Sequence, residues 1–293
     1  MPGRIALVSL ATVLILGVGE MSCDAAGLSN PFYAMDTAFR RPGLTQDQQF
    51  KLVKDLGYDG IGWHQEPPAR ARANAEAMEK LGLKMFAIYC PLRVNPKSEL
   101  TYSPDLPKLM AALKGHGTIV WVYIAGRGPA FDKLTGKEPL VATLRKLSEI
   151  AQANGLRIAI YPHYGQWTAR FADATRLAEV VNHPAFGVSF NLCHALAVGE
   201  ESRIPDLLAR AGKRLFTVTI CGADSGVTGP NWRRLIQTLD KGTYDVGIVL
   251  RKLSEIGFEG PIGFQGYGIR ADARSILEPT IAAWRKLAGQ AMP

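Results

Sequence analysis

The sequence has few of the residues that build disulfide scaffolds and structural zinc sites. It contains four cysteines and five histidines in 293 residues, and no two cysteines form a Cys-x-x-Cys pair. This composition excludes a disulfide-rich scaffold and argues against a structural zinc site. Cys90, Cys193 and Cys221 each lie in or beside an expected buried strand, where thiols behave as small hydrophobic groups.

The chain also lacks low-complexity segments, extended linkers and long runs of one charge. Hydrophobic residues make up 47% of it, which excludes disorder and provides enough apolar material for one large domain or two small ones. The net charge of +8 comes from scattered basic residues, and clusters such as Arg40-Arg41 and Arg233-Arg234 are too short for a nucleic-acid-binding stripe. We therefore predict no nucleic-acid partner, and a small anionic ligand or a generally basic surface is the simpler account.

Only one apolar run is long enough to suggest a targeting segment. It extends from Ile5 to Gly19 after a single basic residue, Arg4, and small residues follow it. The run of 15 residues matches the core of a secretory signal better than a spanning helix, which needs ~20 residues. We predict a signal peptide over residues 1–26, a mature domain over 27–293, and an exported protein, periplasmic or secreted.

A lipid anchor is a weaker alternative for the same segment. Met21-Ser22-Cys23 resembles a lipoprotein cleavage site, but Glu20 occupies a position where an aliphatic residue is expected. We predict no transmembrane segment in the mature chain, because no second run is long and apolar enough to cross a bilayer.

The remaining chain repeats one unit, an amphipathic helix that stops at glycine and is followed by a short apolar strand. In the first helix Thr45 and Gln48 have the spacing of a capping box, and Gly57 provides the stop. The strands are nearly continuous apolar runs, as a buried parallel sheet requires. Eight are expected, over residues 32–35, 59–63, 85–89, 118–124, 157–161, 187–191, 215–221 and 261–265. Eight such units in about 265 residues predict an α/β fold, a single (β/α)8 TIM barrel, with an open doubly wound sheet as the alternative.

In both architectures ligands bind at the carboxyl ends of the strands. His163 and His194 follow the fifth and sixth strands and are predicted to converge as acid and base. The predicted substrate-binding side chains are polar or aromatic and lie at or just beyond strand ends: Trp63, His64, Glu66, Arg127, Tyr161, Trp167, Asn191, Thr219, Gln265 and Tyr267.

Four stretches carry a resemblance to a known family. Residues 56–61, 159–165, 187–194 and 261–266 are similar to the xylose isomerase-like TIM-barrel superfamily, which includes sugar phosphate isomerases and epimerases and the related apurinic endonucleases. The resemblance extends over residues 30–289. It implies a TIM barrel and says little about which substrate the barrel binds.

The resemblance also implies a divalent metal, held by glutamate, aspartate, histidine and glutamate at the ends of strands five to eight. This sequence has Tyr161, Asn191, Thr219 and Gln265 at those four positions, all neutral and polar. Hard cations favour anionic oxygen ligands, so we expect the usual metal site to be absent or much weakened and predict no cofactor.

A rearranged metal site is an alternative that uses His64, His163 and His194, a ligand set suited to zinc or nickel. An apurinic endonuclease is disfavoured, because its several metals require many histidines and carboxylates.

The sequence thus predicts an isomerase- or epimerase-like enzyme for a free or oxidised (keto) sugar, acting by proton transfer at a carbon next to a carbonyl. Amides and hydroxyls would hold the sugar hydroxyls, and Trp63 or Trp167 would stack on the ring. The alternatives are a 3-keto-sugar hydratase or lyase, and a sugar-binding barrel without catalysis.

Overall fold

The structure is a computed structural model that describes residue 3 and residues 27–291. The expected signal peptide, apart from residue 3, and Cys23 lie outside the described residues.

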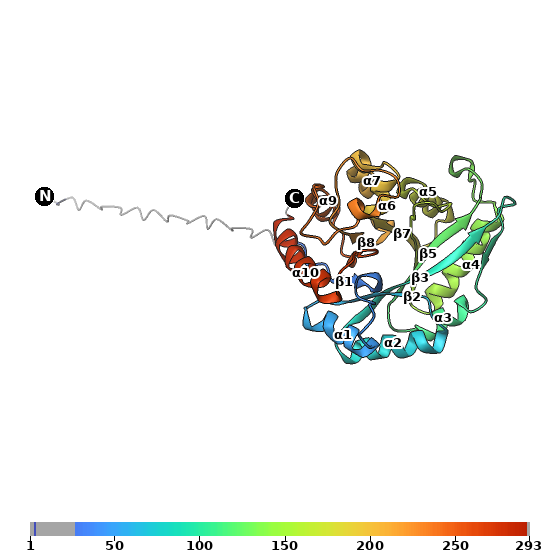
Figure 1. The fold of residues 1–293 in the computed structure, drawn as a ribbon. Helices are drawn as coiled ribbons and strands as arrows, with labels where there is room; N and C mark the ends of the chain where they lie inside the picture. Colours follow the sequence, from blue (N-terminus) through green and yellow to red (C-terminus); the bar gives the residue numbers. More distant parts are fainter. Residues whose placement is uncertain (1–2, 4–26, 292–293) are drawn as a thin grey trace.

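Eight parallel strands close into a barrel, as the sequence predicts. Hydrogen bonds follow the order β2-β1-β9-β8-β7-β6-β5-β3-β4, and an additional pairing between β2 and β3 joins the two sides (Figure 1). β4 lies outside the barrel and pairs antiparallel with β3. The strands are β1 (Phe32–Met35), β2 (Gly60–His64), β3 (Lys84–Val94), β4 (Leu100–Tyr102), β5 (Ile119–Gly126), β6 (Arg157–Ile160), β7 (Phe186–Asn191), β8 (Leu215–Ile220) and β9 (Ile262–Phe264).

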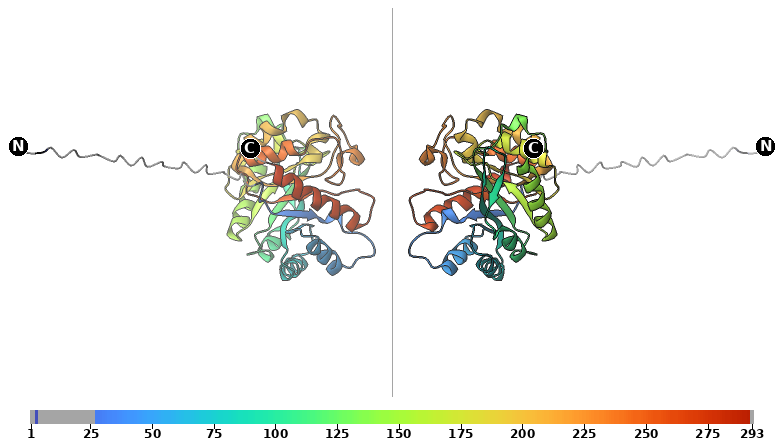
Figure 2. Two further views of the ribbon diagram at one scale, coloured as in Figure 1. Left: turned by 90° about the vertical axis from the view of Figure 1, so that its left-hand side faces the viewer. Right: turned by 90° about the vertical axis from the view of Figure 1, so that its right-hand side faces the viewer.

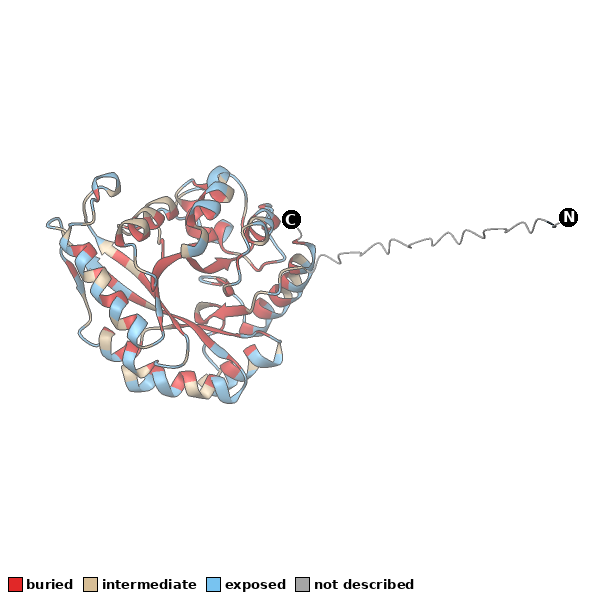
Figure 3. Cartoon of the chain, turned by 180° about the vertical axis from the view of Figure 1, so that it is seen from behind, coloured by how far each residue is buried: buried red, intermediate tan, exposed pale blue. Residues whose placement is uncertain are grey.

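Helices surround the barrel and turn their apolar sides toward it, so that red, buried faces point inward and blue, exposed faces point outward (Figure 3). The α-helices are α1 (Gln46–Asp55), α2 (Pro68–Lys80), α3 (Leu106–Ala112), α4 (Pro139–Ala153), α5 (Phe171–Val181), α6 (Leu192–Ala197), α7 (Ile204–Ala211), α8 (Trp232–Leu235), α9 (Gly247–Glu255) and α10 (Ala273–Gln290). The 3-10 turns are η1 (Asp36–Ala38), η2 (Phe131–Lys133), η3 (Glu201–Arg203) and η4 (Gly212–Arg214).

The predicted helix boundary signals form as expected in the first unit. The Thr45 hydroxyl caps α1 by accepting from the backbone N–H of Gln48. The Gln48 side-chain oxygen accepts from the backbone N–H of Thr45, which completes the capping box. Gly57 has φ +87°, a left-handed conformation that glycine adopts without strain, and it turns the chain from α1 into β2.

All eight predicted strands are present, and two are longer than expected. β3 continues to Val94 and β5 to Gly126, because the two strands go on pairing with each other beyond the barrel rim. The apolar pattern predicts neither extension, nor β4, which adds to the free side of β3.

Two separate layers of side chains form the core. One lies between the strands and the helices, and the other fills the barrel with aromatic residues such as Tyr33, Trp121 and Tyr161. The Trp121 and Tyr161 rings stack with centroids 4.0 Å apart. Such a filled interior leaves the ligand only the carboxyl end of the barrel.

The last helix, α10, packs against the first strand, β1, so the C-terminal part of the chain contacts the N-terminal part. α10 lies beside β1 (Figure 2), and Trp284 stacks on Phe32 with ring centroids 4.3 Å apart. In the described part of the chain no helix is both long and apolar enough to cross a membrane.

Candidate active site

A cavity of about 420 Å³ opens at the carboxyl ends of the barrel strands. Its only charged lining residue among those described is Arg40, and the others are aromatic, polar or apolar. The lining consists of Met35, Thr37, Arg40, Tyr89, Tyr123, Tyr161, His163, Gln166, His194, Trp232, Ile236, Gln265 and Tyr267. This is the concave, largely aromatic site with few polar groups that small ligands require.

The Tyr161 hydroxyl is the point where the polar groups of the cavity floor converge. Three nitrogens surround it: Asn191 Nδ2 at 3.4 Å, Gln265 Nε2 at 3.3 Å and His194 Nε2 at 3.2 Å. Tyr161 is buried, and burial raises the pKa of its hydroxyl well above the usual value. The phenol therefore keeps its proton at neutral pH.

The Gln265 side chain has a fixed orientation. Its Oε1 accepts from the Thr37 hydroxyl at 2.8 Å and from the backbone N–H of Tyr267 at 3.2 Å. A backbone N–H can only donate, so Oε1 faces that side and Nε2 faces Tyr161. The Asn191 amide is oriented likewise: its Oδ1 accepts from the Cys193 thiol at 3.0 Å, so its Nδ2 faces the Tyr161 hydroxyl.

His194 is held by a backbone donor on one side. The N–H of Tyr164 donates to His194 Nδ1 at 3.3 Å, so Nδ1 carries no proton. Burial, with a further contribution from the charge of His163, lowers the His194 pKa well below its usual value. The neutral ring thus carries its proton on Nε2 and donates to the Tyr161 oxygen.

His163 has the opposite tautomer. Its Nδ1 lies 3.0 Å from the Tyr164 carbonyl oxygen, which can only accept, so Nδ1 carries the proton. Nε2 then has a lone pair, for which no hydrogen-bond partner is present among the described residues. Burial lowers the pKa of His163, so the ring is neutral near pH 7. Its ring centroid lies 4.2 Å from that of His194.

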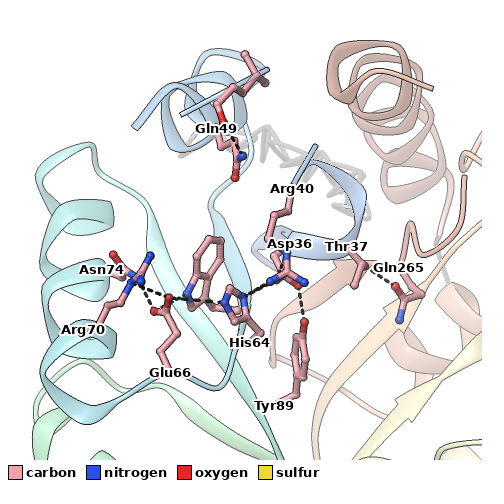
Figure 4. Close-up of polar contacts among 12 residues, drawn as sticks. Asp36, Thr37, Arg40, Gln49, His64, Glu66, Arg70, Asn74, Tyr89 and Gln265 are labelled. Carbon is pink, nitrogen blue, oxygen red and sulfur yellow. Dashed lines mark hydrogen bonds and ion pairs between the residues drawn. The ribbon is translucent and has the colours of Figure 1, made fainter. Parts of the chain in front are cut away.

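A second polar cluster lies at the end of β1, beside the cavity (Figure 4). The Asp36 carboxylate is fully buried and accepts from the Tyr89 hydroxyl at 2.8 Å and from His64 Nδ1 at 2.7 Å. Arg40 Nε lies 3.5 Å from the same carboxylate. Asp36 therefore positions Tyr89 and Arg40, both of which line the cavity.

Glu66 extends this cluster away from the cavity. Its Oε2 accepts from Trp63 Nε1 at 2.9 Å, and its Oε1 lies 3.1 Å from Arg70 Nε and 3.6 Å from His64 Nε2. Asn74 also donates to Glu66. These contacts give Trp63 and Glu66 a structural role that joins β2 to α2.

The structure brings together only some of the predicted site residues. Tyr161, His163, His194, Gln265 and Tyr267 line the cavity. Asn191 is 2% exposed and acts on the cavity through Tyr161, and the buried Thr219 hydroxyl has no hydrogen-bond partner among the described residues. Trp63, His64 and Glu66 form the cluster behind the cavity wall.

Arg127 and Trp167 lie away from the cavity. Arg127 is exposed just beyond the end of β5. Trp167 stacks on Phe131 with centroids 4.4 Å apart, and its Nε1 donates to the Pro129 carbonyl at 3.2 Å. Its ring therefore packs against the β5–α4 loop and is not part of the cavity lining.

Several lining residues escaped the sequence analysis. Thr37 follows the first predicted strand by two residues, so the strand-end criterion would have identified it, together with the buried Asp36 that holds Tyr89 and Arg40. Tyr89 likewise ends the expected third strand. Trp232 carries no such signal, because α8 belongs to the long segment between β8 and α9.

The residues present do not fit the metal site that the family resemblance implies. The four ligand positions hold neutral groups, and the Tyr161 hydroxyl keeps its proton and accepts from neighbouring N–H groups. Of the alternative histidine set, His163 and His194 lie together with ring centroids 4.2 Å apart, whereas His64 pairs with Asp36 and does not line the cavity. The described residues contain no group of three histidine, cysteine, aspartate or glutamate side chains arranged to hold a metal ion.

Comparison with known sequences then places the chain. The family model described as "Xylose isomerase-like TIM barrel" matches residues 50–287. The chain belongs to the xylose isomerase-like TIM barrel family. No protein with a curated description matches it.

Solved structures of the same fold include proteins with sugar-related names. The IOLI protein with a binding zinc atom has a TM-score of 0.70 at 18% identity, covering 89% of this chain and 99% of its own. An L-ribulose 3-epimerase has a TM-score of 0.67 at 14% identity, covering 89% and 95%. The 3-keto-D-glucoside 4-epimerase YcjR from E. coli has a TM-score of 0.64 at 16% identity, covering 88% and 99%. At these identities the likeness shows the shared barrel.

Proposed function

We propose that this member of the xylose isomerase-like family is an exported enzyme that isomerises or epimerises a free or oxidised sugar. The reaction moves a proton at a carbon next to a carbonyl group, without the family's usual metal ligands. One observation carries the proposal: a neutral histidine with a free lone pair and a protonated phenol face the same cavity.

His163 is the base in this scheme. Its Nδ1–H is held by the Tyr164 carbonyl, so Nε2 takes the proton from the sugar carbon and the ring becomes an imidazolium. The electron pair of the broken C–H bond forms the double bond of an enol. Return of the proton to the former carbonyl carbon, while the adjacent hydroxyl gives its proton to the Tyr161 phenolate, yields the isomer. The epimer forms when water protonates the original carbon on its opposite face, the enol proton returns to Tyr161 and the His163 imidazolium gives its proton to water.

Tyr161 is the acid. Its O–H donates to the carbonyl oxygen of the sugar as negative charge develops there, and the three N–H groups around the phenol oxygen stabilise the charge it takes on. His194 acts through Tyr161, because both of its ring nitrogens are engaged by protein groups. It is a positioning residue, whereas the sequence analysis treated it as an acid or base.

The test is exchange of sugar C–H protons with deuterium. The probes are D-fructose, D-ribulose and 3-keto-D-glucose in D2O, followed by proton NMR, after dialysis of the protein against chelator. We expect exchange next to the carbonyl of at least one probe, and a loss of about 10²–10⁴-fold in His163→Gln and in Tyr161→Phe. Binding, measured by saturation-transfer NMR, should persist in both variants.

Two controls match these variants. His183→Gln removes a histidine that lies outside the cavity lining, and Tyr244→Phe removes a buried hydroxyl without a hydrogen-bond partner among the described residues. Both should exchange at the wild-type rate. Binding without exchange in the wild type would favour the non-catalytic alternative, and loss of water from the probe would favour the hydratase or lyase.

A further inference from the structure

A second cavity of about 430 Å³ adjoins the first and shares two residues with it, Tyr123 and Gln166. It lies over the strand extensions that pass the barrel rim. Its lining is Pro91, Leu92, Arg93, Thr101, Tyr102, Tyr123, Ala125 and Gln166. Here we call the structure formed by β4, the end of β3 and the end of β5 the ribbon (residues 91–94, 100–102 and 123–126).

The ribbon continues the inner wall of the barrel outward. Alternate residues of a strand lie on the same face, so the face of β3 that carries Tyr89 inside the cavity carries Pro91 and Arg93 outside it. In β5 the same face carries Tyr123 and then Ala125, which are the register partners of Pro91 and Arg93. One continuous surface thus leads from the cavity floor to the ribbon.

The two strands that form this surface run together past the rim (Figure 1), whereas β6 ends at Ile160 and β2 at His64. At about 3.3 Å per residue, the four residues after Cys90 extend β3 by roughly 13 Å. This length accommodates another ring linked to one in the cavity.

The opposite face of the ribbon is covered by the protein. Leu92 and Val94 are buried, at 2% and 1% exposure, so the ribbon is a supported wall. Arg93 presents guanidinium donors at the outer end, and the Thr101 hydroxyl, which donates to the Arg93 carbonyl at 3.3 Å, presents an acceptor oxygen. Tyr123 provides a flat aromatic face at the junction of the two cavities.

We infer that the substrate is a glycoside or disaccharide, with the reacting ring in the barrel cavity and the second ring on the ribbon. This inference rests on the proposed function only for the identity of the reacting ring. The ribbon recognises the second ring by polar contacts from Arg93 and Thr101 and by packing on Tyr123, and it leaves the first ring against His163 and Tyr161.

Binding measurements test the second subsite without requiring turnover. The probes are cellobiose against methyl β-D-glucopyranoside and maltose against methyl α-D-glucopyranoside, measured by titration calorimetry. We expect at least one disaccharide to bind the wild type tenfold or more tightly than its methyl glycoside. Equal affinities in both pairs would overturn the inference.

Two ribbon variants locate the effect. Arg93→Ala removes an exposed donor, and Ala125→Trp fills the second cavity opposite it. Each should weaken the disaccharide about tenfold and leave the methyl glycoside within twofold. Arg127→Ala is the control, since it removes an exposed arginine just past the ribbon that does not line either cavity.

The outcomes separate this inference from the proposed function. Ribbon-dependent disaccharide binding with no proton exchange on any sugar would support the subsite and refute the enzyme. Exchange with ribbon variants that bind both classes of sugar like the wild type would support the enzyme and refute the subsite.

Discussion

At the scale of single residues, the site gains its properties from backbone groups that fix side-chain protons. The Tyr164 N–H and the Tyr164 carbonyl assign opposite tautomers to His194 and His163, which lie next to each other. One histidine is thereby left as a donor toward Tyr161 and the other as a base. Two neutral rings at this distance also avoid the repulsion that two imidazolium ions would suffer.

This arrangement predicts a dependence of stability on pH. Burial lowers the pKa of both His163 and His194 below the usual value of about 6.5, so the unfolded chain binds protons first as the pH falls. Their contribution is complete above about pH 6.5 and is lost as the pH falls through the window below it. Urea unfolding between about pH 7 and pH 5 should show a steeper loss in the wild type than in the His163→Gln, His194→Gln double variant. Equal slopes would contradict the assignment.

Asp36 provides a second prediction at this scale. Asp36→Asn replaces the charged acceptor of His64 and Tyr89 and weakens the anchor of Arg40. We expect a loss of about 1.5–3 kcal/mol in the free energy of unfolding, measured with urea, because hydrogen bonds to buried charged groups are worth that much. Asp55→Asn removes an exposed carboxylate paired with Lys51 and should change stability little. A loss in Asp36→Asn no larger than in this control would show that the cluster is not held by charge.

The sequence predicted the site unevenly for a physical reason. Position at a strand end says which residues come near the cavity, and this was sufficient for His163, His194 and Gln265. Side-chain length then decides which of them reach it: Tyr161 lines the cavity, whereas Thr219 is fully buried and does not. No pattern in one strand contains that information.

At the scale of elements, the barrel units were predictable and the ribbon was not. Each helix–glycine–strand unit is local, so helix caps and apolar runs indicate it. The extension of β3 and β5 depends on pairing between residues about 30 positions apart, and β4 depends on a turn through Ser98, which has φ +61°. Neither feature has a local signal in the sequence, so the expected third strand stops at residue 89.

A substitution at Gly126 tests whether the close contact between the ends of β5 and β3 stabilises the ribbon. Gly126 ends β5 with φ +100°, and a Cβ atom there would overlap the Val94 carbonyl oxygen, which accepts from the Arg127 N–H. Gly126→Ala should therefore cost about 1–3 kcal/mol of unfolding free energy. Gly115→Ala is the matched control, because Gly115 has φ +90° but open space around its Cβ position. If urea unfolding gives the same loss in both variants, the contact with Val94 contributes nothing.

At the scale of the whole molecule, closure of the barrel brings together side chains that lie far apart in the sequence, such as Tyr161 and Gln265, which are 104 positions apart. Tyr161, Asn191 and Gln265 come from three different strand ends and meet only because β6, β7 and β9 belong to one closed sheet. In the family that the chain belongs to, the resemblance implies that these positions hold a metal. Here the same geometry places two amides and a histidine around a phenol, so the fold is kept while the donor chemistry is neutral.

The barrel should regain affinity for metal when negative charge is restored at these positions. Asn191→Asp together with Gln265→Glu supplies two carboxylates beside the Tyr161 oxygen, and hard cations favour such anionic oxygens. We expect elemental analysis of protein purified without chelator or added metal to find little divalent metal in the wild type and more in the variant. Added Mn²⁺ should likewise raise the Tm of the variant alone.

Asn182→Asp with Gln290→Glu is the control for added charge, since both side chains are exposed and lie outside the cavity lining. It should match the wild type. Stoichiometric metal in the wild type would contradict this prediction. It would require ligands other than these neutral groups, such as histidines, and His163 would then be a candidate metal ligand and no longer the base. The amides of Asn191 and Gln265 therefore determine whether this barrel binds a divalent metal. At each position, replacing the amide nitrogen by oxygen adds a negative charge beside the Tyr161 hydroxyl.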